Sequence, residues 1–464
     1  MREQETEAQT ARVSVITLGC AKNEVDSEEM LGMLAQSGYI VEHAHSPEDA
    51  ASGTDVLIVN TCAFIESARE ESINSILEAL QKKKRGEVKK VIVTGCLAQR
   101  YPKELAESLP EVDGFLGTGQ MDRASEAVRS SLIRTEQIVE IAEKPHHRWA
   151  KMPTRVRLGS PWSAYLKISE GCDHACTFCA IPSFRGKHTS KPLDAILIEA
   201  QNLAAEGVRE LNLIAQDSTQ YGYDLYGEMR LPQLLHSLSE IKELHWIRLF
   251  YCYPSRVNRG VIEALAGIEK VCSYIDMPLQ HSEDSMLRRM RRPMSRAGYL
   301  KLLNEMRDAI PDAAIRTTFI VGFPGETDQQ FADLEAFIEE ARFDRVGVFP
   351  YSSEEGTPAA DMRPSVPLRI RQKRRDALLL RQQKISLSRN SSWIGRSMEI
   401  LIERRSQLDP ASAIGRSFRD APEVDGEVIV RNCTALPGTF VNTRVVEARP
   451  YDLTAEWVNT RTAH

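Results

Sequence analysis

The sequence predicts an α/β protein with an N-terminal parallel α/β domain, a central (β/α)6 partial TIM barrel and a C-terminal OB-like β-barrel. Three observations predict this fold class. Continuous apolar strands alternate with helical segments in the first part of the chain, further strand–helix repeats follow, and short alternating strands fill the last 70 residues. We place the domain boundaries at 11–145, 158–390 and 393–461.

The composition is that of a multidomain globular protein. The chain has 464 residues, of which 42% are hydrophobic and 27% charged. Its net charge of −6 gives no sign of nucleic-acid binding. We expect no membrane helix and no secretory signal, because no long apolar run occurs and the N-terminus is polar. We therefore expect a cytoplasmic protein, whose nine cysteines suit metal or redox chemistry better than disulfides.

Three apolar strands in the N-terminal region each end in a cysteine: Val13–Cys20, Asp55–Cys62 and Val88–Cys96. Helical segments follow the first two strands, at 26–36 and 66–84. Because the carboxyl ends of parallel strands share one edge of a sheet, we expect the thiols of Cys20, Cys62 and Cys96 to converge there. The alternative is three small buried core residues.

A linker rich in proline and basic residues, 145–161, precedes six strand candidates. The candidates are 164–171, 210–218, 246–254, 274–280, 315–325 and 345–352. Helical segments such as 192–207 and 329–341 lie between them, which predicts a barrel or partial barrel. The chemistry of such folds sits at the carboxyl ends of the strands.

The segment SEGCDHACTFCAIPSFRG follows the first of these strands and carries Cys172, Cys176 and Cys179 in C-x₃-C-x₂-C spacing. A 4Fe–4S cluster held by three thiolates keeps one iron free of protein ligands. S-adenosylmethionine can chelate that iron, and an electron from the cluster then cleaves it to a 5′-deoxyadenosyl radical. The alternative is a zinc site with His174 or His188 as fourth ligand, although the C-x₂-C pair usual for zinc occurs only once here.

For the remaining segments the sequence predicts structural roles rather than chemistry. The basic segment 366–390 predicts a solvated connecting helix. Strands at 398–405, 426–433, 438–449 and 453–458 predict the C-terminal barrel. Cys252, Cys272 and Cys433 have no partner at ligand spacing, so we interpret them as packing residues.

Nearly the whole chain resembles the radical S-adenosylmethionine methylthiotransferases. TLGCAKNEVDSEEM, VNTCAFIESAREES and VTGCLAQRY resemble the cysteine blocks of the N-terminal methylthiotransferase domain of that family. EGCDHACTFCAIPSFRG resembles the radical block, and LNLIAQDSTQYG, MPLQHSEDSMLRRMRRP, TTFIVGFPGET and FPYSSEEGTPAA resemble later barrel blocks. The resemblance implies a radical-SAM core, a C-terminal TRAM domain, two 4Fe–4S clusters and S-adenosylmethionine. The metal ligands it implies are Cys20, Cys62, Cys96, Cys172, Cys176 and Cys179.

Within this family the blocks resemble the branch that methylthiolates the β-carbon of an aspartate in ribosomal protein twelve of the small subunit. The runner-up is the branch that modifies an adenosine in tRNA, and a third possibility is a non-catalytic iron–sulfur adaptor. A slight acidic excess after residue 395 favours a basic protein substrate. The resemblance also implies a flavodoxin- or ferredoxin-type electron donor, a sulfur donor and a monomeric enzyme.

Two departures from the family pattern stand out. Ala21 occupies a position where the branch usually has proline, and no GGE triplet follows the second barrel strand. The resemblance therefore does not identify the residues that bind the cofactor. The strand-end residues Gln216, Gly322 and Glu326 are the candidates for S-adenosylmethionine binding.

Overall fold

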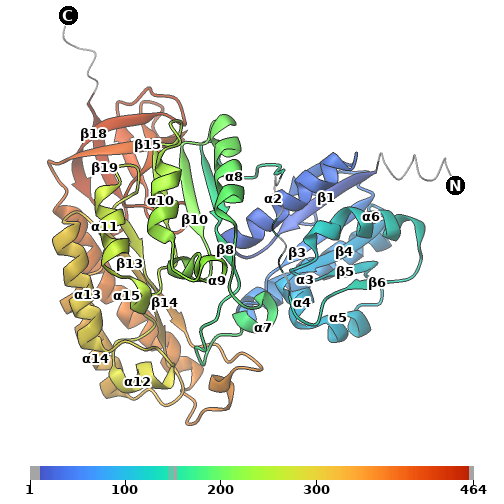
Figure 1. Cartoon of the computed structure of the whole chain (residues 1–464), viewed down its shortest axis with the longest axis horizontal. Helices are drawn as coiled ribbons and strands as arrows, with labels where there is room; N and C mark the ends of the chain where they lie inside the picture. Colours follow the sequence, from blue (N-terminus) through green and yellow to red (C-terminus); the bar gives the residue numbers. More distant parts are fainter. Residues whose placement is uncertain (1–10, 146, 148, 150–153, 459–464) are drawn as a thin grey trace, which may run out of the picture.

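The structure is a computed structural model that describes residues 11–145, 147, 149 and 154–458. Figure 1 shows the N-terminal α/β unit in blue and cyan, the central unit in green to orange and the C-terminal barrel in red. Part of the predicted linker, and the last three residues of the predicted third domain, lie outside the described residues. No described helix is long and apolar enough to cross a membrane.

The N-terminal unit is a six-stranded sheet in the order β2-β1-β3-β4-β5-β6, and every neighbouring pair is parallel. Its strands are β1 (Arg12–Thr17), β2 (Ile40–Ala44), β3 (Val56–Thr61), β4 (Lys90–Gly95), β5 (Gly114–Leu116) and β6 (Ile138–Glu140). The helices are α2 (Ala21–Gln36), α3 (Glu66–Lys84), α4 (Cys96–Arg100), α5 (Pro102–Ser108) and α6 (Ala124–Ile133). The three predicted strands are the central β1, β3 and β4, and α3 has the predicted bounds.

Both faces of this sheet are buried, which explains why its strands are continuously apolar. Along β3, Val56 and Ile58 pack into the cluster on one face, whereas Leu57 and Val59 pack into the cluster on the other. Successive residues of a strand point to opposite faces, so a sheet covered by helices on both sides needs apolar residues at every position.

The central unit contains two three-stranded parallel sheets, β11-β10-β7 and β12-β13-β14. The strands are β7 (Ser163–Lys167), β10 (Glu210–Ile214), β11 (Trp246–Leu249), β12 (Tyr274–Asp276), β13 (Ala314–Val321) and β14 (Arg345–Pro350). A parallel bridge between Ile247 and Val271 links the two sheets, so all six predicted strands belong to one partial barrel. The covering helices are α8 (Leu193–Ala205), α10 (Leu231–Ser239), α11 (Arg259–Gly267), α12 (Asp284–Arg289), α13 (Arg296–Ala309) and α14 (Asp328–Ala341).

The basic helix α15 (Leu368–Ser391) is only partly solvated, which corrects the sequence-based expectation. Leu378 and Ile385, seven residues apart, join the barrel core, and Gln382 donates to the backbone oxygen of Phe343 at 2.8 Å. Arg374 is buried and pairs with Glu326. One stripe of the helix therefore closes the barrel beside β14 while its other residues face solvent.

The C-terminal unit is a closed five-stranded barrel in the order β15-β16-β17-β19-β18. Its strands are β15 (Ser397–Arg405), β16 (Ala413–Ser417), β17 (Val428–Arg431), β18 (Phe440–Ala448) and β19 (Leu453–Trp457). β16 was not predicted, because its sequence AIGRS carries glycine, arginine and serine in place of an apolar run. Cys252, Cys272 and Cys433 are buried in apolar clusters, as expected of packing residues.

Candidate functional site: two sets of three cysteines

The structure brings the three N-terminal cysteines together at one edge of the first sheet. Cys20 is the N-cap of α2 after β1, Cys62 follows β3 directly, and Cys96 opens α4 after β4. Gly19 has a left-handed φ of +96°, and a Cβ on it would lie 2.8 Å from Sγ of Cys62. The first two cysteine segments therefore approach so closely that glycine is needed beside Cys20.

These thiols differ in exposure. Cys20 is exposed, whereas Cys62 and Cys96 are buried. Burial and the neighbouring thiols of Cys62 and Cys20 together raise the pKa of Cys96 to about 12, although the guanidinium of Arg185 acts to lower it. Binding of iron would therefore have to displace the proton of Cys96.

The second set lies on one loop between β8 (Ser169–Glu170) and α7 (Ile181–Arg185). The N–H of Cys172 donates to the oxygen of Gly186, which ties the start of the loop to the end of α7, and the N–H of Cys179 donates to the oxygen of Cys176, which closes a turn within the loop. Burial raises the pKa of both Cys172 and Cys179 to about 12. The neighbouring thiols of Cys176 and Cys172 add to the rise in the pKa of Cys179.

Each set has an arginine directed at one of its sulfurs. Nε of Arg185 donates to Sγ of Cys96 at 3.2 Å, and Nη1 of Arg292 lies 3.7 Å from Sγ of Cys176. Three thiols accompanied by a buried cation fit a thiolate-bound iron–sulfur cluster, because the guanidinium offsets the negative charge of the ligands. Among the described residues, no three His, Cys, Asp or Glu side chains are arranged to hold a single metal ion.

The two histidines proposed for a zinc site have other partners. Nε2 of His174 lies 2.7 Å from Asp217, and its ring stacks on Tyr253 with centroids 3.5 Å apart. Nε2 of His188 lies 3.1 Å from Oγ of Ser190, and the ring is buried. These contacts disfavour either residue as a fourth metal ligand.

Of the three residues predicted to bind the cofactor, two are engaged by the chain itself. Gly322 has a φ of +69°, and a Cβ there would clash with Arg371 of α15. The Glu326 carboxylate accepts from the N–H of Gly322 and from Arg374, and it faces His281. These contacts favour a structural role for Gly322 and Glu326.

Gln216 differs from the other two candidates. Its Nε2 donates to Glu170 at 2.6 Å, but its buried Oε1 has no hydrogen-bond partner among the described residues. Glu170 lies two residues before Cys172, so Gln216 stands beside the cysteine loop. Its role toward S-adenosylmethionine stays a prediction.

A largely apolar cavity adjoins the cysteine loop and the segment that follows Cys62, and it was not predicted from the sequence. Phe64 and Ile65 come from the segment after Cys62, and Phe178 and Cys179 come from the loop. The other wall is formed by the end of β14 and the segment after it, where Phe349, Pro350, Tyr351, Ser352 and Glu354 line it, and Gln280, Thr318 and Ile320 complete it. The aromatic residues next to Cys62 and in the FPYSS block are the sequence feature that could have indicated this cavity.

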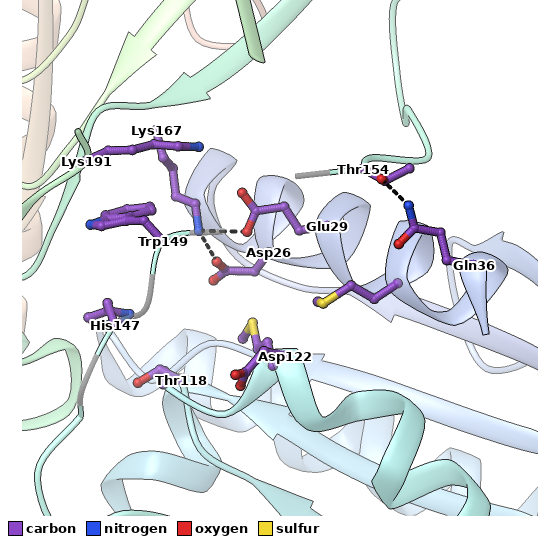
Figure 2. Close-up of a pocket in the computed structure, with 13 residues that line it drawn as sticks. Asp26, Glu29, Gln36, Thr118, Asp122, His147, Trp149, Thr154, Lys167 and Lys191 are labelled. Atoms are coloured by element: carbon purple, nitrogen blue, oxygen red, sulfur yellow. Dashed lines mark hydrogen bonds and ion pairs between the residues drawn. The ribbon is translucent and has the colours of Figure 1, made fainter. Parts of the chain in front are cut away.

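A buried ion network links the N-terminal unit to the central unit near the cysteine sets. Lys167 of β7 pairs with Asp26 of α2 and lies 3.7 Å from Glu29. Figure 2 marks both contacts with dashed lines. Burial alone would lower the pKa of Lys167, but Asp26 and Glu29 outweigh it and raise that pKa. The network joins the helix that follows Cys20 to the strand that precedes Cys172.

Three family models match the chain in order. They are Uncharacterized protein family UPF0004 over residues 12–117, the Radical SAM superfamily over 166–338 and the TRAM domain over 394–458. Among solved structures, the radical S-adenosylmethionine methyltransferase TsrM from Kitasatospora setae has a TM-score of 0.54 over 73% of both chains at 13% identity, a likeness of fold alone.

Curated proteins give closer matches. The ribosomal protein uS12 methylthiotransferase RimO of Desulforamulus reducens is 46% identical over 96% of this chain and 99% of its own. The protein of the same name in Geobacter sulfurreducens is 44% identical over 97% of this chain and 99% of its own.

The fold and the cysteine loop define a radical S-adenosylmethionine enzyme, whose domain carries a 4Fe–4S cluster and S-adenosylmethionine. An N-terminal α/β unit and a TRAM barrel flank that domain. The chain belongs to the ribosomal protein uS12 methylthiotransferase family, and its enzyme class is methylthiotransferase. The family resemblance noted from the sequence is thereby confirmed.

Proposed function

We propose that this enzyme methylthiolates the β-carbon of an aspartate in ribosomal protein uS12, using two 4Fe–4S clusters. Cys172, Cys176 and Cys179 would hold the cluster that binds S-adenosylmethionine. Cys20, Cys62 and Cys96 would hold the second. When bound, the first cluster supplies the electron that cleaves S-adenosylmethionine, and the second supplies a place for the sulfur to be inserted.

The observation that carries this proposal is the cavity that lies between the cysteine loop and the segment that follows Cys62. Cys179 lines it, and Phe64 and Ile65 bring the segment after Cys62 to the same space. A side chain that entered this cavity would lie beside Cys179 and beside the residues that directly follow the Cys62 segment. The apolar walls exclude water, which protects a radical from side reactions.

The charges of the TRAM barrel support a protein substrate over tRNA. Arg416 and Arg419 count as basic in the sequence, but both are buried. At the surface, Arg404 pairs with Glu427 and Arg431 pairs with Glu447. Fewer free cations therefore remain for a phosphate backbone than the sequence suggests.

The remaining assignments follow from this function. The enzyme would take electrons from a flavodoxin- or ferredoxin-type protein, receive sulfur from a separate donor and work as a monomer in the cytoplasm. The predicted boundaries 11–145, 158–390 and 393–461 remain our proposal for its three domains.

The deciding experiment is mass spectrometry of ribosomal protein uS12 and of tRNA nucleosides from cells that lack the gene. Replacement of one hydrogen by a methylthio group adds about 46 Da, so the mutant uS12 should be lighter by that mass. An unchanged uS12 together with loss of a methylthioadenosine from tRNA would establish the alternative substrate. Reduced protein that fails to cleave S-adenosylmethionine would indicate an adaptor.

A further inference from the structure

Arg185 reaches from the cysteine loop of the central domain into the N-terminal domain. It is the last residue of α7, six residues after Cys179, and α7 packs against α4. Its Nε donates to Sγ of Cys96 at 3.2 Å, and its Nη2 donates to Oδ1 of Asn23 at 2.5 Å. A residue that is close in sequence to one cysteine set therefore contacts a thiol of the other set.

Asn23 extends this contact toward the other two N-terminal cysteines. It lies in the first turn of α2, three residues after Cys20, and its Nδ2 donates to the backbone oxygen of Thr61, the residue before Cys62. The same Nδ2 also donates to the oxygen of Leu18. Arg185 and Asn23 together thus fix the segments that carry all three thiols.

The third nitrogen of the guanidinium, Nη1, contacts one carboxylate of the central domain and one of α2. Nη1 of Arg185 donates to Glu170 at 2.9 Å and lies 3.0 Å from Asp26. Glu170 precedes Cys172 by two residues, and Lys167 pairs with Asp26 on the other side. The side chain of Arg185, which is only 2% exposed, therefore contacts residues next to both cysteine sets.

Hydrogen bonds to ligand sulfurs and nearby charge are the main controls of the potential of an iron–sulfur cluster. A buried guanidinium bonded to a ligand thiolate stabilises the more negative, reduced cluster. The rigid, planar guanidinium donates to Cys96 and to Asn23 at fixed angles. A lysine ammonium keeps the positive charge but has no such fixed arrangement of donors. The contact at Cys96 is shorter than the contact of Arg292 at Cys176, 3.2 Å against 3.7 Å.

We propose that Arg185 is a positioning residue that locks the N-terminal cysteine set to the radical loop and sets the reduction potential of the cluster held by Cys20, Cys62 and Cys96. The inference rests on the proposed second cluster. It makes the N-terminal cluster dependent on a residue of the radical domain, so that the two clusters are coupled through one side chain.

The test uses the full chain in which Cys172, Cys176 and Cys179 are replaced by alanine, so that only the N-terminal cluster remains. In this background we compare native Arg185 with Arg185→Gln and Arg185→Lys, and follow reduction by EPR at controlled potentials. Arg185→Gln should lower the ratio of reduced to oxidised cluster about tenfold at a fixed potential, which is about 59 mV for one electron. Arg185→Lys should shift the potential less, because it keeps the charge but loses the fixed arrangement of donors.

Arg292→Gln is the matched control, because it removes a second buried guanidinium, one that lies at the loop of the other set and not at Cys96. In the same background it should leave the potential of the N-terminal cluster unchanged. A full iron load with an unshifted potential in Arg185→Gln would overturn the role of Arg185 alone. Iron near zero with native Arg185 in place would overturn the second cluster and the role of Arg185 together.

Failure of the variants to load iron is also informative. Loss of iron in Arg185→Gln and Arg185→Lys, with thermal unfolding at the temperature of the parent, supports positioning of the thiols by Arg185. Unfolding of both variants would instead assign Arg185 to the general stability of the domain and refute its specific role.

Discussion

Arg416 of the TRAM barrel donates hydrogen bonds to both carboxylate oxygens of Glu210, at 3.2 and 2.6 Å. Glu210 begins β10 of the central barrel and also accepts from Arg248 at 3.0 Å and Ser163 at 2.9 Å. Glu210 and Arg248 are fully buried, and Arg416 nearly so. The TRAM barrel is thus joined to the catalytic barrel through a buried charge cluster and is not a loosely tethered module.

Replacement of Glu210 should strongly destabilise the chain. Glu210→Gln leaves Arg416 and Arg248 buried without their shared carboxylate, and loss of one partner of a buried pair costs about 3–5 kcal/mol. Urea unfolding, followed by tryptophan fluorescence, should report a free energy of unfolding reduced by that amount. Glu240→Gln, at an exposed residue, is the control and should change it by less than about 0.5 kcal/mol. Equal stabilities of the two variants would contradict this role of Glu210.

The Glu210 contribution should also depend on pH. Burial would raise the pKa of Glu210, but Arg416 and Arg248 outweigh burial and lower it from 4.5 to about 2. Because the folded-state pKa lies below the unfolded value, the stabilisation is complete above about pH 4.5 and is lost as the pH falls toward 2.

The measurement is the difference in urea midpoint between the native chain and Glu210→Gln at a series of pH values. The difference should be constant from pH 7 to about pH 5 and should shrink steadily at lower pH. A difference that persists unchanged to pH 3 would show that Glu210 does not act through its charge.

The sequence predicted the local structure well because each signal was local. Three apolar strands that end in cysteine identified β1, β3 and β4, and the helix at 66–84 was placed to the residue. The contacts that join the domains were not predictable in this way. Glu210 and Arg416 are 206 residues apart, and nothing near either residue marks the other as its partner.

This interface also changes how the TRAM barrel should be tested. From the sequence alone, removal of residues 395–464 is a clean way to separate substrate docking from chemistry. In the structure, the deletion would leave Glu210, Arg248 and Arg345 without the partners that bury them. The shortened chain would lose stability before its activity could be interpreted, so point variants are the better probes.

Glu354 should couple the N-terminal domain to catalysis. Its buried carboxylate accepts from Arg100 at 2.8 Å and from Arg69, both in the N-terminal domain. Arg100 also donates to the oxygen of Ala63, beside Cys62. Glu354→Gln should therefore loosen the N-terminal cysteine set at the cavity. We expect the ratio of methylthiolated product to 5′-deoxyadenosine to fall about tenfold, equivalent to about 1.4 kcal/mol.

The neighbouring residue gives the control for Glu354. Glu355 is exposed, and Glu355→Gln should leave the ratio of product to 5′-deoxyadenosine unchanged. If Glu354→Gln reduced both products in proportion, the residue would support the radical step itself and not the junction of the domains.

Phe64 should contribute to substrate binding at the cavity. Its ring is 52% exposed and lines the largely apolar cavity, so a substrate side chain bound there would cover it. Phe64→Ala should lower kcat/KM for the protein substrate about tenfold, or about 1.4 kcal/mol, with iron content and uncoupled cleavage of S-adenosylmethionine unchanged. Ile133→Ala, at an exposed apolar residue outside the cavity, should have no effect. An unchanged kcat/KM in Phe64→Ala would exclude its ring from substrate binding.

The two cysteine sets should have separable roles. Cys20, Cys62 and Cys96 meet only in the folded N-terminal sheet, whereas Cys172, Cys176 and Cys179 share one loop. Conversion of the first set to alanine should halve the iron from ~8 to ~4 per chain, and the variant should still form 5′-deoxyadenosine but insert no sulfur. Conversion of the second set should also leave ~4 iron per chain but stop formation of 5′-deoxyadenosine. Cys252→Ala serves as control, because this cysteine is buried in the barrel core and should leave the iron content unchanged. If the first variant still yielded methylthiolated product, the N-terminal thiols would be structural and the two-cluster assignment would be wrong.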